Sequence, residues 1–416
     1  MPEDPNPSSS KTQRNRWLNR TVIGMGLTSL LADAGYETAT AILPSFLGAI
    51  GAPAVALGTI EGVADAVSSF VKLASGWWGD RLGRRKPIVT LGYALSGGMT
   101  AVFAVATTWP LVLVGKTVGW FGKGLRGPLR DALLAESIPP QHRGKAFGFH
   151  RAGDTIGAIV GPLLAAALLQ WLPARAGDET APFRTIFLLA LIPGLGSALA
   201  FALLVREERR GPHRARFWTS VRLLPPSFRK YLLALAVFGA GDFSHTLLIF
   251  AVTRSLGPTG SSSETFVRTA GVGALLYALR NVFYAAFSYP AGALSDRYDR
   301  RSLLAGGYVL GATVMAGFGF VTATSPNIVL FAILMALAGV YIAIEDSLEG
   351  ALTADLILDE RLRGTAYGVR GTVNGLGDLA SSVIVGLLWD RVGLPAGFAY
   401  AAVMMFAGAA LLYRRR

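Results

Sequence analysis

The chain has 416 residues, of which 52% are hydrophobic and only 16% are charged, and it contains no cysteine. A soluble globular protein carries about 25% charged residues, so this composition indicates a membrane protein. The lack of cysteine excludes disulfides, thiolate metal sites and a cysteine nucleophile. The formal net charge of +13 is interpreted as basic residues facing anionic lipid, not as a nucleic-acid site.

Residues 1–20 are polar, rich in Pro, Ser and Asn, and end in basic residues, which predicts a disordered tail. The apolar run that follows is too long for the core of a signal peptide. It also carries Asp33 and Glu37 and has no persuasive small-residue cleavage site. We therefore expect this run to remain in the protein as its first membrane span.

Apolar stretches of spanning length recur along the chain. A spanning helix needs roughly 20 mainly apolar residues, so this chain has room for about twelve. The predicted spans are 21–49, 54–78, 88–107, 109–129, 146–171, 183–205, 231–256, 266–293, 303–323, 326–352, 365–389 and 396–413. The predicted fold is an all-α membrane protein made of two pseudo-symmetric six-helix bundles.

The polar segment 206–230 divides the predicted spans into two equal groups and contains Pro212, Pro225 and Pro226. We predict an N-terminal bundle at 21–205, a cytoplasmic linker at 206–230 and a C-terminal bundle at 231–416. Halves related by an axis along the membrane normal commonly hold substrate between them near the middle of the membrane.

Lysine and arginine gather on one side of the predicted membrane. If the N-terminus is cytoplasmic, the outward-facing connections hold only Arg175, Arg184, Arg254, Arg268 and Arg391. The remaining basic residues of the connections then lie inside, as the positive-inside rule requires. We expect a multi-pass protein of the inner or plasma membrane with both termini in the cytoplasm.

Two loops have similar sequences. Gly76–Arg85 reads Gly-Trp-Trp-Gly-Asp-Arg-Leu-Gly-Arg-Arg, and Gly292–Arg301 reads Gly-Ala-Leu-Ser-Asp-Arg-Tyr-Asp-Arg-Arg. Arg143–Gly148 is echoed in the same way by Arg363–Gly368. Because matching segments fall at matching places in the two halves, the sequence indicates duplication of one six-helix unit.

The first copy of this loop resembles the signature that follows the second helix in the major facilitator superfamily, Gly-x-x-x-Asp-Arg-x-Gly-Arg-Arg/Lys. The resemblance covers nearly the whole chain. It implies a twelve-helix secondary transporter that works by alternating access, without a cofactor and without enzyme activity. The second copy departs from the pattern, since Asp299 stands where the second glycine would be.

We interpret the loop as a conformational latch. Asp80 is expected to lie against the positive N-terminal end of a neighbouring helix, and Arg84 to reach Asp131 at the end of the fourth span. The alternative is that these arginines only follow the positive-inside bias. The predicted latch residues are Gly76, Asp80, Arg81, Gly83, Arg84, Arg85, Asp131, Asp296 and Arg297.

The fifth span carries spaced small residues at Gly148, Gly157 and Gly161, followed by Pro162. This spacing resembles the antiporter signature of the family's drug and proton exchangers, although two closing glycines are alanines here. Small residues on one face allow tight packing on a partner helix, and the Gly-Pro pair bends the helix. Ordinary helix packing is the alternative interpretation, while the resemblance favours export.

Four carboxylates lie inside the first two spans. Asp33 with Glu37, and Glu61 with Asp65, have the i, i+4 spacing that places two side chains on one helix face. An unpaired charge at mid-membrane costs about 2.5 to 3.5 kcal/mol on insertion scales, so a function is expected for them. We predict proton coupling, led by Asp33 and Glu37. For Glu61 the alternative is a wetted position at the outer end of its span.

Two residues of the seventh span, Asp242 and His245, are further candidates for proton coupling, because a histidine titrates near neutral pH. The alternative for His245 is a structural hydrogen bond to a neighbour. Aromatic and charged residues of several spans are predicted to line the substrate cavity. They are Tyr36, Lys116, Trp120, Lys123, Arg126, Tyr277, Arg280, Glu345 and Asp346.

Opposite charges at matching positions of the halves predict further pairs. Aligning the fourth and tenth spans puts Arg130 against Glu349, which predicts a gate across the cavity. The alternative is that each is a charge at a helix end that snorkels to the surface. The predicted partners within one half are Arg151 with Asp154, and Arg370 with Asp378.

We predict a proton antiporter that exports a small apolar or cationic organic compound. The alternatives within transport are a cation-coupled importer and an exporter of a metal or its chelate. Outside transport, the alternative is an uncoupled sensor or lipid-handling protein. The chain has no phosphate-cradling Gly-Lys-Ser/Thr and no His-Glu-x-x-His motif, so ATP drive and a bound metal are not expected. The expected partners are protons, a small substrate and the lipid bilayer, and the protein is expected to be a monomer.

Overall fold

The computed structural model describes residues 18–82, 84–138, 143–172, 178–207, 224–257, 263–295, 298–357 and 360–414. These residues form thirteen α-helices. They are α2 (Arg20–Ala49), α3 (Ala54–Leu82), α4 (Lys86–Val105), α5 (Trp109–Glu136), α6 (Arg143–Trp171), α7 (Ala181–Leu204), α9 (Pro226–Gly239), α10 (His245–Leu256), α11 (Ser263–Ser295), α12 (Arg300–Ala323), α13 (Ile328–Leu356), α14 (Glu360–Arg391) and α15 (Leu394–Arg414).

The prediction of an all-α membrane protein is confirmed. Each predicted span corresponds to one helix, with the exception of the seventh, which consists of α9 and α10. Within the described residues, nine helices are long and apolar enough to cross a membrane. The first and fourth predicted spans, α2 and α5, are not among these nine, and both contain several charged residues. Their charges belong to the site described below.

The seventh span is broken between Gly239 and His245. Glycine disfavours a helix interior, and Gly241 lies so close to α15 that a Cβ atom there would be 2.6 Å from the carbonyl oxygen of Ala401. Two serines of α14 bind the freed backbone: Ser381 donates to the Asp242 carbonyl at 2.8 Å, and Ser382 accepts from the Ser244 N–H at 3.1 Å. Irregular backbone at membrane depth is tolerated where it is bonded in this way or lines a cavity.

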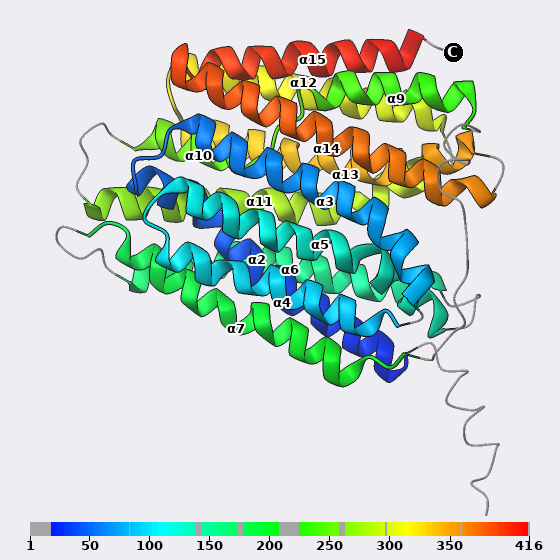
Figure 1. Ribbon diagram of the computed structural model, residues 1–416. Coiled ribbons are helices and arrows are strands. Elements are labelled where there is room, and N and C mark those ends of the chain that lie inside the picture. Colours follow the sequence, from blue (N-terminus) through cyan, green and yellow to red (C-terminus); the bar gives the residue numbers. More distant parts are fainter. Residues whose placement is uncertain are drawn as a thin grey trace, which may run out of the picture.

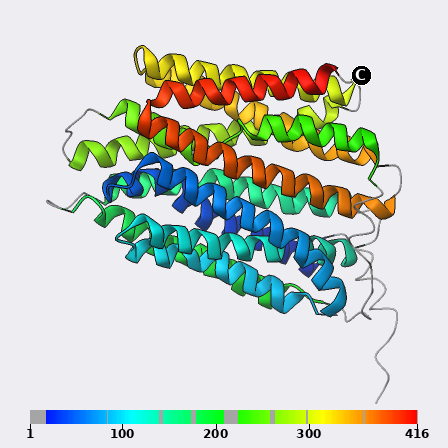
Figure 2. The same ribbon diagram turned by 45° about the horizontal axis from the view of Figure 1, so that its top comes forward.

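The helices run roughly side by side in one elongated bundle (Figure 1). α2 to α7 lie in the lower part of that view, and α9 and α12 to α15 in the upper part, with α10 and α11 between them. The turned view in Figure 2 keeps this division. Across it, α3 packs against α14 and α6 packs against α11. α2 begins at the end of the bundle where α15 finishes, and we call the opposite end the far end.

Glycines allow α3 and α14 to approach closely. A Cβ atom at Gly58 would lie 2.0 Å from the carbonyl oxygen of Ser382, so a larger residue would force the helices apart. At the far end, the Asp390 carboxylate of α14 accepts hydrogen bonds from the N–H groups of Ala54 and Val55, both at 2.8 Å. A carboxylate of the C-terminal half therefore caps the first turn of α3 in the N-terminal half.

Candidate functional site

A cavity of about 210 Å³ lies between the two groups of helices. Its lining comes from α2, α3, α5, α10, α11, α13 and α14, together with the break before α10. The lining residues are Tyr36, Glu61, Asp65, Trp120, Lys123, Asp242, Phe243, Ser244, His245, Arg280, Tyr341, Ile342 and Asp378. Both halves therefore contribute charged and aromatic side chains to one space.

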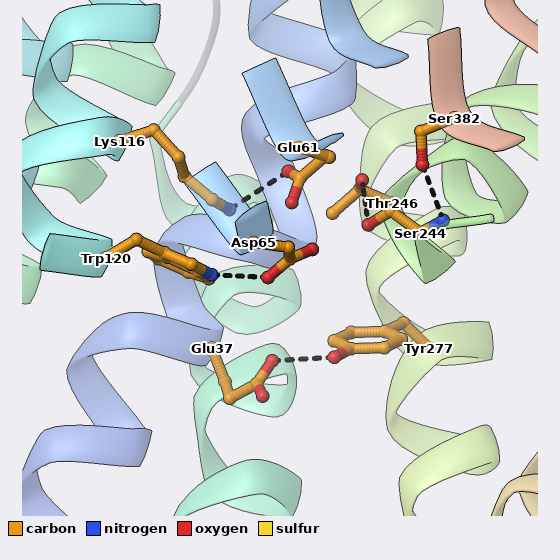
Figure 3. A network of polar contacts seen from close by, with 9 residues as sticks. All are labelled: Glu37, Glu61, Asp65, Lys116, Trp120, Ser244, Thr246, Tyr277 and Ser382. Carbon is orange, nitrogen blue, oxygen red and sulfur yellow. Dashed lines mark hydrogen bonds and ion pairs between the residues drawn. The ribbon is translucent and has the colours of Figure 1, made fainter. Parts of the chain in front are cut away.

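On the N-terminal side, the acids of α3 bind side chains of α5 (Figure 3). The Lys116 ammonium donates to Glu61 Oε1 at 2.9 Å, and these side chains are 1% and 2% exposed. Trp120 Nε1 donates to Asp65 Oδ1 at 2.6 Å. The wetted surface position considered for Glu61 is therefore wrong, because that carboxylate forms a buried ion pair.

The lysines of α5 also lie over aromatic rings. Lys123 Nζ is 4.6 Å from the ring centroid of Tyr36 and 4.9 Å from that of Trp120. Lys116 Nζ is 4.1 Å from the Trp120 ring. The two rings meet edge to face, with their centroids 4.9 Å apart. A cation over an aromatic face is attracted by the electrons of the ring, so these contacts hold both ammonium groups beside the cavity.

A carboxylate of the N-terminal half binds a hydroxyl of the C-terminal half. Tyr277 of α11 donates to Glu37 Oε2 of α2 at 2.7 Å, and both side chains are buried (Figure 3). The ring of His245 stacks on Tyr277 with the centroids 5.0 Å apart and the planes 3° apart. The Nε2 atom of His245 has no hydrogen-bond partner among the described residues. His245 thus contacts its neighbour by stacking.

Asp33 and Glu37 share one face of α2 and lie against glycines of α6. A Cβ atom at Gly157 would be 2.9 Å from Asp33 Cβ, and one at Gly161 would be 2.8 Å from Glu37 Cβ. The small-residue face predicted for the fifth span therefore packs on the acidic face of α2. Pro162 lies inside the same helix. Asp33 is not among the residues that line the cavity.

Acids of the C-terminal half bind tyrosine hydroxyls. Tyr341 donates to Asp242 Oδ1 at 3.1 Å. Outside the cavity lining, Tyr308 donates to Glu349 Oε1 at 2.6 Å and Asn374 donates to Glu349 Oε2 at 3.2 Å. Asp346, predicted to line the cavity, instead binds a tyrosine of α11: Tyr284 donates to its Oδ2 atom at 2.8 Å.

The predicted gate between Arg130 and Glu349 is not formed in this structure. Arg130 binds the adjacent carboxylate, with Nη2 2.8 Å from Asp131 Oδ1, while Glu349 has the partners given above. Residues at equivalent positions of the two halves need not touch. The repeated sequence determines where each residue lies within its own half, but it does not determine the distance between the two residues.

The predicted partnerships within each half have different outcomes. The Arg151–Asp154 pair is confirmed, with Nη1 and Oδ2 3.8 Å apart. The guanidinium of Arg370 lies 5.4 Å from the ring centroid of Tyr367. Within the part of the chain that the structure describes, it forms no ion pair with Asp378, which faces the cavity instead.

The predicted cavity residues divide into two groups. Tyr36, Trp120, Lys123 and Arg280 line the cavity, as do four candidates for proton coupling: Glu61, Asp65, Asp242 and His245. The other predicted cavity residues are not part of this lining. Lys116 and Tyr277 hold lining residues in place, Arg126 stacks on Tyr93 with its Cζ atom 4.0 Å from the ring centroid, and Glu345 is buried on α13.

Phe243, an aromatic residue of the seventh span that was also considered for a pocket lining, faces the cavity. Four lining residues were missed by sequence reasoning: Ser244, Tyr341, Ile342 and Asp378. The first belongs to the break in the seventh span. The glycines before it, with Asp242, are a recognisable signal for the end of one helix and the start of another. The other three face the cavity only because of how α13 and α14 are turned, which has no local signal.

Most of the predicted latch lies outside the described side chains, namely Gly76, Asp80, Arg81, Gly83, Asp296 and Arg297. Near the end of this loop, the carboxylate of Glu207 accepts from the backbone N–H of Arg85 at 2.5 Å and of Lys86 at 3.1 Å. This carboxylate caps the start of α4. Asp131, expected to meet Arg84, is bonded to Arg130.

The sequence model of the Major Facilitator Superfamily matches residues 25–273 and 231–416. The chain belongs to this superfamily. It is 30% identical over 400 residues to an uncharacterized MFS-type transporter of Methanocaldococcus jannaschii, a match that covers 96% of each chain. It is 25% identical over 211 residues to a multidrug resistance protein B homolog of Mycobacterium tuberculosis, covering 50% of this chain and 37% of that protein.

The fold agrees with this membership. The crystal structure of a bacterial homolog of the human lysosomal transporter Spinster, inward-facing and occupied, matches with a TM-score of 0.71 at 17% identity, covering 99% of this chain and 97% of that one. The protein is therefore a multi-pass membrane transporter and not an enzyme. Transporters of this superfamily generally need no cofactor.

Proposed function

We propose that this transporter is a proton-coupled antiporter that exports a small organic compound, apolar or cationic, by alternating access. We also propose that both termini face the cytoplasm. The observation that carries the proposal is the 2.7 Å hydrogen bond between Glu37 and Tyr277. It joins α2 to α11, so the protonation state of one buried carboxylate acts on a contact between the two halves.

The chemistry of this bond supports coupling. An ionised carboxylate accepts a hydroxyl in a short, charge-assisted hydrogen bond, and protonation of Glu37 removes the charge that strengthens it. The two halves must separate on one side of the membrane in each cycle, and this contact is one of those that join them. Protonation therefore changes the relative free energies of the two arrangements, which is what coupling requires.

The cavity supports exchange of a proton for a compound. Asp65 of α3, Asp242 of the break before α10 and Asp378 of α14 face the same space. A cationic group bound there neutralises the charge that a proton would otherwise neutralise, so the two ligands compete. By linkage, each weakens the binding of the other by the same factor. The aromatic rings in the lining suit the apolar part of a small organic molecule.

The packing of α6 on α2 supports the link between the acids and the movement of the helices. The glycines that resemble an antiporter signature lie against Asp33 and Glu37. Because these glycines of α6 have no side chain of their own, α2 lies in close contact with α6 there. A shift of α2 on protonation would therefore be accompanied by a shift of α6, which in turn packs on α11 of the other half.

Transport in liposomes tests the proposal. The purified protein would be reconstituted with an acidic interior, and ethidium and a panel of aromatic amines would be added outside. We expect the wild type to accumulate a compound inside as protons leave. Glu37→Gln should abolish this accumulation but keep exchange of the compound at equal pH, because a neutral amide cannot carry the proton. The matched control is Asp355→Asn, because Asp355 binds Arg300 away from the cavity.

Two results would contradict the proposal. Accumulation driven by the gradient in both Glu37→Gln and Asp33→Asn would remove these residues from proton coupling. Movement of compound and protons in the same direction, followed with a pH-sensitive dye, would exclude antiport.

A further inference from the structure

We propose that the cavity contains an anion subsite, formed by Arg280 and the first turn of α10, and that the transported compound carries a carboxylate in addition to a cationic group. The substrate class is therefore a small zwitterion with an apolar body. The cationic group rests on the proposed function, whereas the anion subsite rests on independent contacts.

Arg280 is a buried cation that forms no ion pair with any carboxylate that the structure describes. Its side chain lines the cavity and is 7% exposed. Its Nη1 atom donates to the neutral amide of Asn281 at 3.1 Å, and its Nε atom has no partner among the described residues. No carboxylate described by the structure lies within 4 Å of this guanidinium as an ion pair. Burying a charge in this way is costly, and an anionic ligand would remove the cost.

The nearest acids are engaged elsewhere. Glu37 of α2 accepts from Tyr277, and Asp242 accepts from Tyr341. Either carboxylate would be an ordinary partner for an arginine, and both bind tyrosine hydroxyls instead. Neither acid forms an ion pair with Arg280, so its guanidinium can still donate hydrogen bonds to an anion in the cavity.

The first turn of α10 is the second part of the subsite. Helix N-termini attract anions, because their first N–H groups lack partners within the helix and the helix dipole is positive there. The α10 helix begins at the cavity, where both Ser244 and His245 belong to the lining. The side chain of Ser244 makes no capping hydrogen bond, and the first turn contains no acidic residue.

One aromatic ring places these two parts beside each other. His245, the first residue of α10, stacks on Tyr277 at 5.0 Å, and the Cζ atom of Arg280 lies 5.8 Å from the centroid of the same ring. The guanidinium and the first residue of α10 thus neighbour the same ring, and both line the cavity. The subsite that we propose is a single carboxylate bound between them.

The cavity thus favours molecules that carry both charges over molecules that carry only one. A simple cation would be attracted by Asp65 and Asp378 but repelled by Arg280 and by the Lys123 ammonium. A simple carboxylate would be attracted by Arg280 and Lys123 but repelled by Asp65 and Asp378. A compound that carries both charges can satisfy each group, so specificity arises from repulsion of the wrong class as well as attraction of the right one.

Binding to the purified transporter tests this inference without any transport step. The probes are phenylalanine and leucine, their amides, which lack the carboxylate, and 3-phenylpropanoate and 4-methylpentanoate, which lack the amine. Affinities would be measured by thermal shift in chloride-free buffer of constant ionic strength, because inorganic anions would compete for the subsite. We expect at least one of the two amino acids to bind about 10-fold more tightly than its amide and its des-amino analogue.

Variants assign the effect to Arg280. Arg280→Gln should weaken binding of the amino acid about 10-fold and change binding of the amide by less than about 2-fold. Arg280→Lys should retain part of the affinity, since it keeps the charge. Arg254→Gln, at the other end of α10, is the matched control and should change neither.

The possible results separate this inference from the proposed function. The inference is overturned if no amino acid binds, if the amides bind the wild type as tightly as the amino acids, or if Arg280→Gln weakens both classes equally. Proton-driven accumulation of amines without preference for a carboxylate would leave antiport standing and remove the subsite. Carboxylate-dependent binding without proton-driven accumulation would support the subsite and contradict antiport.

Discussion

Two acids on opposite walls of the cavity are held in different ways. In the N-terminal half, Glu61 binds an ammonium group, and both partners stand on uninterrupted helices. In the C-terminal half, Asp242 binds a neutral tyrosine hydroxyl and lies in the break between α9 and α10. The first arrangement cancels charge inside the protein. The second, like the hydrogen bond from Trp120 to Asp65, leaves a charge that a proton or a ligand can cancel.

The largest effect is expected at the buried ion pair. Lys116→Met would leave Glu61 charged and unpartnered, and removing one partner of a buried pair costs about 3 to 5 kcal/mol. We therefore expect a large loss of thermal stability in detergent. The double variant Lys116→Met with Glu61→Gln should recover most of it, because no charge is then left alone. A double variant as unstable as the single one would show that the lysine matters for its packing and not for its charge.

A smaller effect is expected at matching glycines of the repeat. A Cβ atom at Gly157 would lie 2.6 Å from the Leu30 carbonyl oxygen, and one at Gly377 would lie 2.9 Å from the carbonyl carbon of Gly239. Overpacking costs about 1 to 3 kcal/mol. Gly157→Ala should reach that range because α2 is continuous at Leu30. Gly377→Ala should cost less, because Gly239 ends α9 and can shift. Equal losses of thermal stability in the two variants would mean that the break after α9 does not help the backbone at Gly239 to shift.

The smallest effect is expected at a tyrosine of the C-terminal wall. Tyr341→Phe removes one hydroxyl from Asp242, and hydrogen bonds between membrane helices contribute about 0.6 kcal/mol on average. We expect a small decrease in thermal stability. Tyr308→Phe is the matched control, since Glu349 keeps its bond to Asn374. A loss at Tyr341 as large as that of Lys116→Met would erase the contrast between the two walls.

The fold was predictable because its signal is local. The sequence of each span is a run of mainly apolar residues. The helices begin and end close to the predicted limits. The break at residues 240–244 was the exception. The apolar run of the seventh span continues through Phe243. Hydropathy averaged over the length of a span therefore indicates one uninterrupted helix. The glycines mark the break locally, whereas the contacts that hold it come from α14 and α15, which are far away in the sequence.

The site was predictable in kind but not in pairing. Some charged residues inside spans, such as Lys123 and Arg280, line the central cavity as predicted, because a charge in a span is costly unless it has a function or a partner. Others, such as Arg126 and Asp346, do not line it. Their partners could not be read from spacing. Glu61 binds Lys116, and Glu37 binds Tyr277, on helices distant in the sequence. Arg130 and Glu349 occupy matching positions of the repeat but do not bind each other. Sequence symmetry specifies equivalent positions, and distance depends on how the halves dock.

The cap that Asp390 places on α3 ties the two halves together at the far end. Two N–H groups of the first turn bind this carboxylate from the opposite half, so any movement that opened this end would have to break both bonds and replace them with bonds to water. A single carboxylate at the rim therefore joins backbone and side chain across the same boundary that the cavity occupies deeper in the bundle.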